Sequence, residues 1–99
     1  MRYKIIIEYD GTPFVGWQRQ DNGLSVQECI ETAIESLFQE KPTLFGAGRT
    51  DSGVHATGQV AHFDITTKEL DTYSIKTGLN HYLKIYPISI LDVTEVDAE

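Results

Sequence analysis

The sequence predicts an α+β domain of the split βαβ, or ferredoxin-like, type, in which a four-stranded antiparallel sheet carries two helices on one face. Segments with the periodicity of strands and of helices follow one another in the order β-α-β-β-α-β. The 99 residues, of which 40% are hydrophobic and 23% charged, suit one small globular domain spanning residues 1–99. The chain shows no internal repeat, low-complexity tract or linker that would divide it.

The first strand is predicted at residues 3–9, where side chains alternate with the period of two that strands show. One face consists of Tyr3, Ile5, Ile7 and Tyr9, and the other of Lys4, Ile6 and Glu8. Residues 10–24 contain several Gly and one Pro and predict a long connection. Because Phe14 and Trp17 within it are large apolar residues that need cover, we expect this connection to be structured.

A helix is predicted from Ser25, which forms a capping box with Glu28, to a point near Pro42. Its apolar positions recur with helical spacing at Val26, Ile30, Ala33, Ile34, Leu37 and Phe38. The acidic residues Glu28, Glu31 and Glu35 are expected to point away from the core.

The rest of the chain predicts two strands, a second helix and a last strand. Residues 43–47 are consistent with a short strand, and residues 59–65 predict a clearer one. A second helix is capped by Asp71 or Thr72, ends before Pro87 and has an apolar stripe of Ile75, Leu79, Tyr82 and Leu83. Residues 88–96 predict the last strand. The sheet face without helices contains apolar side chains, so we expect an RNA, another domain or a second subunit against it.

The charge distribution weakens an RNA-binding interpretation without excluding it. The net charge is −7, but most of the excess acid lies in residues 21–40 and 86–99, whereas residues 41–64 are balanced. Salt screens charges over about 8 Å, so the opposite sheet face need not feel that acid strongly. Any surface for a polyanion is expected to be incomplete in these residues. With the single cysteine Cys29 and no long apolar run, we expect a cytosolic protein without disulfide or membrane span.

The densest concentration of chemically reactive residues is at residues 48–53. Arg49 and Asp51 lie two positions apart between Gly48 and Gly53, so the guanidinium can hold the carboxylate ionised. An ionised aspartate in a loop over an open sheet is a candidate nucleophile or general base. A tight turn with a local ion pair explains the same residues, and the spacing alone favours that alternative.

Other site types fail on the residues present. A Walker loop needs Lys where Val54 stands, and a dinucleotide fingerprint needs a third Gly where Asp51 stands. His55 and His62 without a second cysteine do not predict a metal site. We expect His62 to be a half-covered strand residue and His81 to lie on a helix surface.

A second cluster of aromatic and amide side chains occupies residues 9–20. Its members Tyr9, Trp17, Gln18 and Gln20 suit stacking on, and hydrogen bonding to, unstacked nucleotides. The plainer alternative is that Phe14 and Trp17 cover the core. The aromatic consensus of RRM domains is absent, so RNA binding of that kind is not supported.

Together these motifs resemble the tRNA pseudouridine synthase A family. The resemblance covers residues 3–65 almost without a gap, and its segments are Tyr9-Asp10-Gly11-Thr12-x-Phe14-x-Gly16-Trp17-Gln18-x-Gln20, Val26-Gln27, Gly48-Arg49-Thr50-Asp51-Ser52-Gly53-Val54-His55-Ala56 and Gly58-Gln59-Val60-Ala61-His62-Phe63. It implies that Asp51 is the catalytic aspartate and Arg49 its partner before substrate enters. It also implies a homodimer that isomerises uridines in the tRNA anticodon stem-loop without a cofactor. RNA or substrate contacts are then expected at Gly48, Thr50, Gly53, His55, Tyr9, Trp17, Gln18 and Gln20.

The chemistry implied by the resemblance needs one carboxylate near a ribose. The C1′–N1 bond of uridine breaks, and the uracil turns and rejoins through C5. Asp51 either attacks C1′ or removes the 2′ proton, and the sequence does not choose between these roles. The base must also leave its stack, at a cost of a few kcal/mol, and Arg49 or an aromatic side chain is a candidate to fill the space.

The chain departs from the family pattern in two places. Leu79-Asn80-His81-Tyr82-Leu83 is followed by three extra residues before Pro87, and the family's members are more than twice as long. We therefore expect an N-terminal half, either an expressed fragment or a truncated gene product, that is inactive alone and pairs through the face its missing C-terminal half would cover. A non-catalytic nucleotide- or RNA-binding module that uses residues 48–53 is the alternative, followed distantly by a structural oligomerisation domain.

Overall fold

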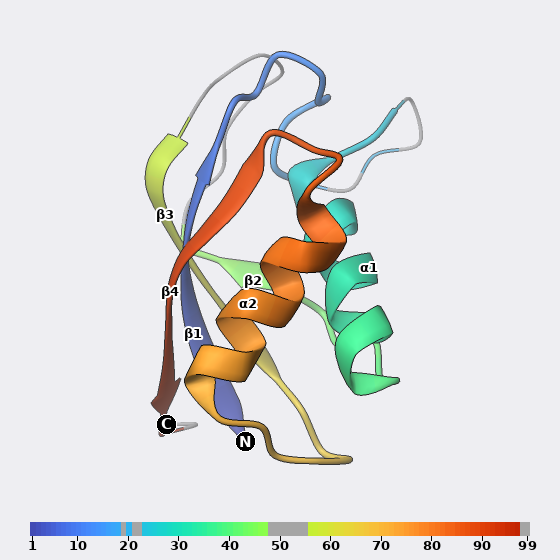
Figure 1. Ribbon diagram of the computed structural model, residues 1–99. Coiled ribbons are helices and arrows are strands. Elements are labelled where there is room, and N and C mark those ends of the chain that lie inside the picture. Colours follow the sequence, from blue (N-terminus) through green and yellow to red (C-terminus); the bar gives the residue numbers. More distant parts are fainter. Residues whose placement is uncertain (19, 21–22, 48–55, 98–99) are drawn as a thin grey trace.

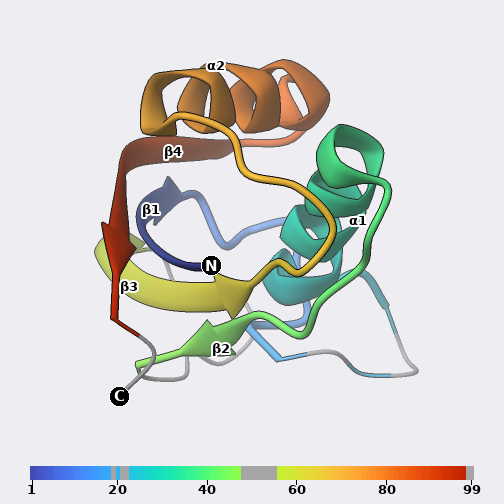
Figure 2. The same ribbon diagram turned by 90° about the horizontal axis from the view of Figure 1, so that it is seen from below.

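A four-stranded antiparallel sheet covered on one face by two helices forms the domain, as predicted. The computed structural model describes residues 1–18, 20, 23–47 and 56–97, and the structural statements below concern these residues. The elements along the chain are β1 (Arg2–Tyr9), α1 (Val26–Phe38), β2 (Phe45–Gly46), β3 (Ala56–Asp64), α2 (Thr72–Leu83) and β4 (Ile88–Val96). The strands are ordered β2-β3-β1-β4, and both helices lie on the same side of them (Figures 1 and 2).

The core lies between this sheet and the helices. Tyr3, Ile5 and Ile7 of β1 are fully buried because alternate side chains of the central strand face the helices. An aromatic cluster joins three elements, with ring centroids of Tyr3, Phe38 and Phe63 separated by 5.7 to 6.2 Å. The Tyr3 hydroxyl donates a hydrogen bond to the carbonyl of Leu70 at 3.3 Å, and burial raises the pKa of this side chain.

The opposite face of the sheet carries no helix and mixes polar with apolar side chains. The register places Lys4 opposite His62, and Ile6 opposite Val60. Phe45, which is 53% exposed, stacks on His62 with ring centroids 5.3 Å apart. At one end, Arg2 donates two hydrogen bonds to Asp64, which hold the pKa of that carboxyl below its usual range. His62 is half-covered, as expected.

Two helix boundaries follow from local capping. The side chain of Ser25 accepts a hydrogen bond from the backbone N–H of Glu28, and that of Asp71 accepts one from Ser74. The prediction that the first helix continues to near Pro42 is wrong, because it ends at Phe38. Gln39 takes the left-handed conformation with φ 58°, a helix ending that usually needs Gly and that its sequence does not signal.

Three further expectations need correction. Tyr82 is 43% exposed, because Ile75, Leu79 and Leu83 already complete the buried stripe of α2. The strand predicted at residues 59–65 begins earlier, at Ala56, which pairs with Tyr9. The short strand at residues 43–47 is restricted to Phe45 and Gly46. The last strand, in contrast, has the predicted bounds.

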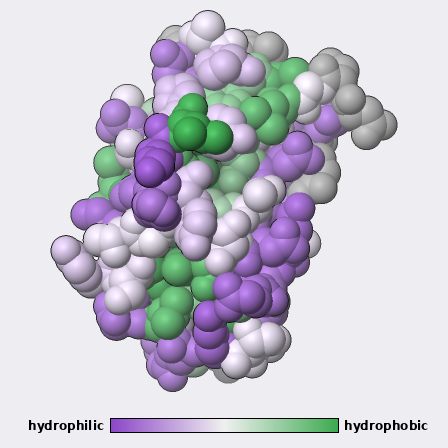
Figure 3. Space-filling view, turned by 45° about the vertical axis from the view of Figure 1, so that its right-hand side comes forward, coloured by the Kyte–Doolittle hydropathy of each residue, from purple (hydrophilic) through white to green (hydrophobic). Residues whose placement is uncertain are grey.

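The helix-bearing side of the molecule is largely polar (Figure 3). Smaller apolar patches interrupt it. His81 of α2 is exposed, as expected. The exposed side chains of Leu24, Tyr82 and Ile85 border a hollow of about 300 Å³ between the two helices. Among the described residues, no helix is long and apolar enough to cross a bilayer.

Glu40, just after α1, joins this helix to the turn after β3. Its two carboxylate oxygens accept hydrogen bonds of 2.9 to 3.3 Å from the backbone N–H and hydroxyl groups of Thr66 and Thr67. The backbone bond from Thr66 is the largest cause that lowers the pKa of Glu40. The folded state therefore favours the ionised carboxylate. Its contribution to stability is complete above the usual glutamate pKa, about 4.3, and is lost as the pH falls through the lower folded-state pKa.

We expect Glu40→Gln to lower stability at neutral pH, because one acceptor oxygen is replaced by a donor that faces other donors. The difference from the parent chain should stay constant between about pH 7 and about pH 5 and should shrink as the pH falls below the usual glutamate pKa of about 4.3 and through the lowered folded-state pKa. Urea midpoints measured across this range test the prediction. Glu35→Gln, at an exposed position of α1, is the matched control. A Glu40→Gln midpoint that runs parallel to the parent at every pH contradicts it.

Candidate active site at one end of the sheet

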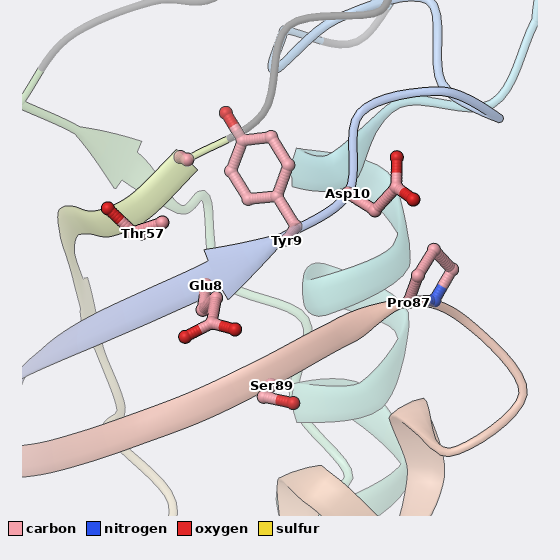
Figure 4. A pocket seen from close by; sticks show the side chains of 7 residues that line it. Glu8, Tyr9, Asp10, Thr57, Pro87 and Ser89 are labelled. Atoms are coloured by element: carbon pink, nitrogen blue, oxygen red, sulfur yellow. The ribbon is translucent and has the colours of Figure 1, made fainter.

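The candidate site lies where β1 ends and β3 and β4 begin. Tyr9 is paired with Ala56 on one side and with Ile88 on the other, so three chain segments converge there. An open hollow of about 450 Å³ is present at this end (Figure 4). It is lined by Glu8, Tyr9, Asp10, Ala56, Thr57, Pro87 and Ser89.

Asn80 of α2 fixes the start of β4, which forms one wall of this hollow. The Asn80 side-chain oxygen accepts from the backbone N–H of Ile90 at 2.8 Å, and its amide donates to the carbonyl of Ile90 at 3.0 Å. The backbone N–H of Asp10 also donates to the carbonyl of Pro87 at 3.0 Å. These bonds tie α2 and the end of β1 to the start of β4. The sequence analysis quoted Asn80 as part of a run but predicted no role for it, because its backbone partner Ile90 lies on another element.

The predicted residues Gly48, Arg49, Thr50, Asp51, Gly53 and His55 lie outside the described residues. The residues on either side are described: Ala47 directly follows β2, and Ala56 begins β3. The backbone N–H of Ala47 donates to the carbonyl of Val60 at 2.9 Å, and Ala56 pairs with Tyr9. The chain therefore leaves the sheet beside β3 and returns to it at the wall of the hollow. The roles of Asp51 and Arg49 remain predictions.

The aromatic residues of the second cluster face the core. Tyr9 and Trp17 are each 3% exposed and their ring centroids are 6.2 Å apart, while Phe14 is 2% exposed. This arrangement agrees with the plainer alternative, in which Phe14 and Trp17 cover the core. Gly16 has φ 118°, a conformation that favours glycine, and Trp17 accepts a backbone hydrogen bond from Gln27 at 2.9 Å. The cluster thus docks the long connection onto the start of α1.

The two predicted glutamines of this cluster are exposed. Gln20 donates from its side chain to the carbonyl of Val15 at 3.1 Å, which stabilises the loop itself. Gln18 lines a polar hollow of about 420 Å³ together with Gln27, Glu31 and Lys41. Neither glutamine lines the hollow at the end of the sheet, so the structure does not bring the four described site residues into one pocket.

The expectation that Glu31 points away from the core is wrong. This side chain is 4% exposed, and its Oε2 accepts hydrogen bonds from the backbone N–H of Leu44 at 2.8 Å and from Nε2 of Gln27 at 3.1 Å. Gln27 also donates to the carbonyl of Leu44 at 3.2 Å. A signal was present in the sequence, since Gln27 and Glu31 lie four positions apart on a helical row that continues to Ile34 and Phe38 of the apolar stripe.

The described residues contain neither a cluster of metal ligands nor a reactive thiol. They contain no group of three or more His, Cys, Asp or Glu side chains placed to hold a metal. Cys29 is 4% exposed, and burial raises the pKa of its thiol to about 11. Its reactive thiolate is therefore scarce at neutral pH.

Comparison with known proteins agrees with the motifs and the fold. The sequence model of the family described as tRNA pseudouridine synthase matches residues 5–98. A protein of Anaplasma marginale named tRNA pseudouridine synthase A is 58% identical over 97 residues, which are 96% of this chain and 39% of the relative. One of Rhizobium meliloti with the same name is 53% identical over 100 residues, 99% of this chain and 40% of the relative.

The chain thus spans about two-fifths of the length of these curated relatives. Its resemblance to them extends beyond residues 3–65 to nearly every residue. A family model that covers almost all of the chain, together with an α+β fold of the expected topology, settles the relationship: this chain belongs to the tRNA pseudouridine synthase family.

Proposed function

We propose that this chain supplies the catalytic aspartate, Asp51, of an enzyme that converts uridine to pseudouridine in the anticodon stem-loop of tRNA. The observation that carries the proposal is the unbroken run Gly48-Arg49-Thr50-Asp51-Ser52-Gly53-Val54-His55-Ala56 inside a family match of residues 5–98. The named function of the relatives, tRNA pseudouridine synthase A, is the activity proposed. We also propose a cytoplasmic location, because tRNA is the proposed substrate.

The reaction is an isomerisation, so its atoms balance without a cofactor. The C1′–N1 bond breaks, a C1′–C5 bond forms, N1 gains a proton and C5 loses one. Asp51 acts either as the nucleophile at C1′ or as the base that removes the 2′ proton. Arg49 pairs with the carboxylate until the extruded uridine enters.

The described part of the chain supports this assignment through the placement of the segment's ends. Residues 48–55 connect β2 to β3, and Ala56 lines the open hollow beside Tyr9. The helix-free face continues from this end of the sheet and exposes Phe45 and Val60. We propose that the rest of a protein of the relatives' length covers part of this face, and that the whole enzyme is a homodimer.

A chimeric enzyme tests the proposal. This chain replaces the first two-fifths of the Rhizobium meliloti relative, and the protein is given tRNA labelled with tritium at C5 of uridine. Because C5 loses its hydrogen in the reaction, released tritium counts turnovers. We expect steady release by the chimera and negligible release by the 99-residue chain alone. A folded chimera that binds tRNA without releasing tritium contradicts the proposal and supports the alternative of a non-catalytic binding module.

A further inference from the structure

We infer that Glu31 and Gln27 of α1 are positioning residues for the reaction. Their side chains hold the backbone N–H and carbonyl of Leu44, and from Leu44 the chain continues through β2 to residues 48–55. This inference rests on the proposed function, because it matters for catalysis only if Asp51 is the reacting group. Neither residue is expected to touch the substrate.

The contacts hold both polar backbone groups of Leu44. The carboxylate of Glu31 accepts from the Leu44 N–H at 2.8 Å, and the amide of Gln27 donates to the Leu44 carbonyl at 3.2 Å. The same amide donates to Glu31 at 3.1 Å, so the two side chains also fix each other. Together they give Leu44 the donor and the acceptor that a neighbouring strand would provide.

Because the Glu31 carboxylate and the Leu44 backbone are buried, they destabilise the fold unless their polar groups form hydrogen bonds. In the described part of the chain, Ser25 and Glu31 are the buried polar side chains, and Leu44 is 1% exposed. A carboxylate withdrawn from water destabilises a fold when it lacks hydrogen bonds, and an apolar side chain would fill the same space without that cost. Glu31 therefore does what an apolar residue there cannot do, namely accept the Leu44 N–H.

The strand that follows Leu44 has few other attachments. Its two residues, Phe45 and Gly46, pair with His62 and Ala61 of β3, and Ala47 adds one backbone bond to Val60. β2 is also an edge strand, so its other side pairs with no strand of the described sheet. The Leu44 clamp of Glu31 and Gln27 thus fixes the chain just before it enters the block that contains Asp51. A displacement of about 1 Å at a reacting group can cost about a hundredfold in rate.

Amide hydrogen exchange of the 99-residue chain tests the clamp without reference to activity. In Glu31→Ala, we expect the amides of Leu44 and Ala47 to exchange at least about tenfold faster, while those of Ile5 and Ile7 in β1 keep their protection. Glu31→Gln retains one acceptor oxygen and should recover much of the protection. Glu35→Ala, on the exposed side of the same helix, is the control and should change none of these rates.

Turnover by the chimeric enzyme tests the consequence. Per folded molecule, Glu31→Ala should lower kcat about 10- to 100-fold and change KM less than about twofold, with a smaller loss in Glu31→Gln and none in Glu35→Ala. A purely structural role would lower only the folded fraction. Unchanged kcat in an active chimera carrying Glu31→Ala, or unchanged exchange at Leu44, overturns the inference and leaves the proposed function standing. An unsubstituted chimera that folds but is inactive overturns the proposed function instead, and the positioning role with it.

Discussion

Asp51→Asn in the chimeric enzyme is expected to abolish pseudouridine formation, with a loss on the order of 10⁴-fold or more in single-turnover tritium release. The asparagine amide has nearly the size of the carboxylate but neither attacks C1′ nor removes a 2′ proton. The magnitude is that of losing a catalytic group in other enzymes. Binding of tRNA should change by no more than a few fold, because affinity for nucleic acids comes largely from contacts of basic groups to phosphates, which an aspartate does not make.

Two comparisons make this test specific. Glu35→Gln removes the same charge from an exposed site on α1 and should leave turnover unchanged. If Asp51→Asn retained more than about a tenth of the rate, the chemistry would belong to another group, since removal of a catalytic side chain usually lowers the rate far more than about tenfold. A parallel fall in tRNA affinity and rate would assign Asp51 to binding rather than to chemistry.

Phe63→Ala is expected to cause the largest loss of stability, about 3–5 kcal/mol. Phe63 is fully buried, and its ring lies 5.7 Å from that of Tyr3 and 6.2 Å from that of Phe38, so truncation leaves a cavity among three elements. Because domains of this size are stable by about 5–15 kcal/mol, the variant should lose a large part of its margin.

Urea unfolding followed by far-ultraviolet circular dichroism measures this loss. Phe45→Ala is the matched control, since Phe45 is 53% exposed and its ring stacks on that of His62. We expect it to cost about 1 kcal/mol or less, the worth of one exposed aromatic pair. Equal losses in the two variants would contradict the placement of the core between the sheet and the helices.

The sequence predicted those parts of the fold that depend on local pattern. Residues 88–96, which directly follow the Pro87 that stops the second helix, were predicted as the last strand, and β4 has these bounds. Ser25 predicted the start of the first helix, and Asp71, one of the two candidates with Thr72, caps the second; each side chain accepts from a backbone N–H three residues away. Such signals lie within one turn of chain, so they can be read without knowledge of the fold.

Features that depend on distant partners were not predictable in this way. The burial of Glu31 follows from its bond to the Leu44 backbone, and the role of Asn80 from its two bonds to Ile90. The early start of β3 follows from pairing with Tyr9. The family motif around Asp51 was readable because it is a contiguous run, whereas the residues expected to support it are spread over α1, β2 and β3.

Cys29 gives the domain an internal reporter of opening. The chain has one thiol, which is 4% exposed and has a pKa raised to about 11. A water-soluble alkylating reagent can therefore modify it mainly through molecules in which α1 has transiently separated from its neighbours. The rate at which a single mass increment accumulates then reports how often that separation occurs, in the parent chain and in each variant, with no added label.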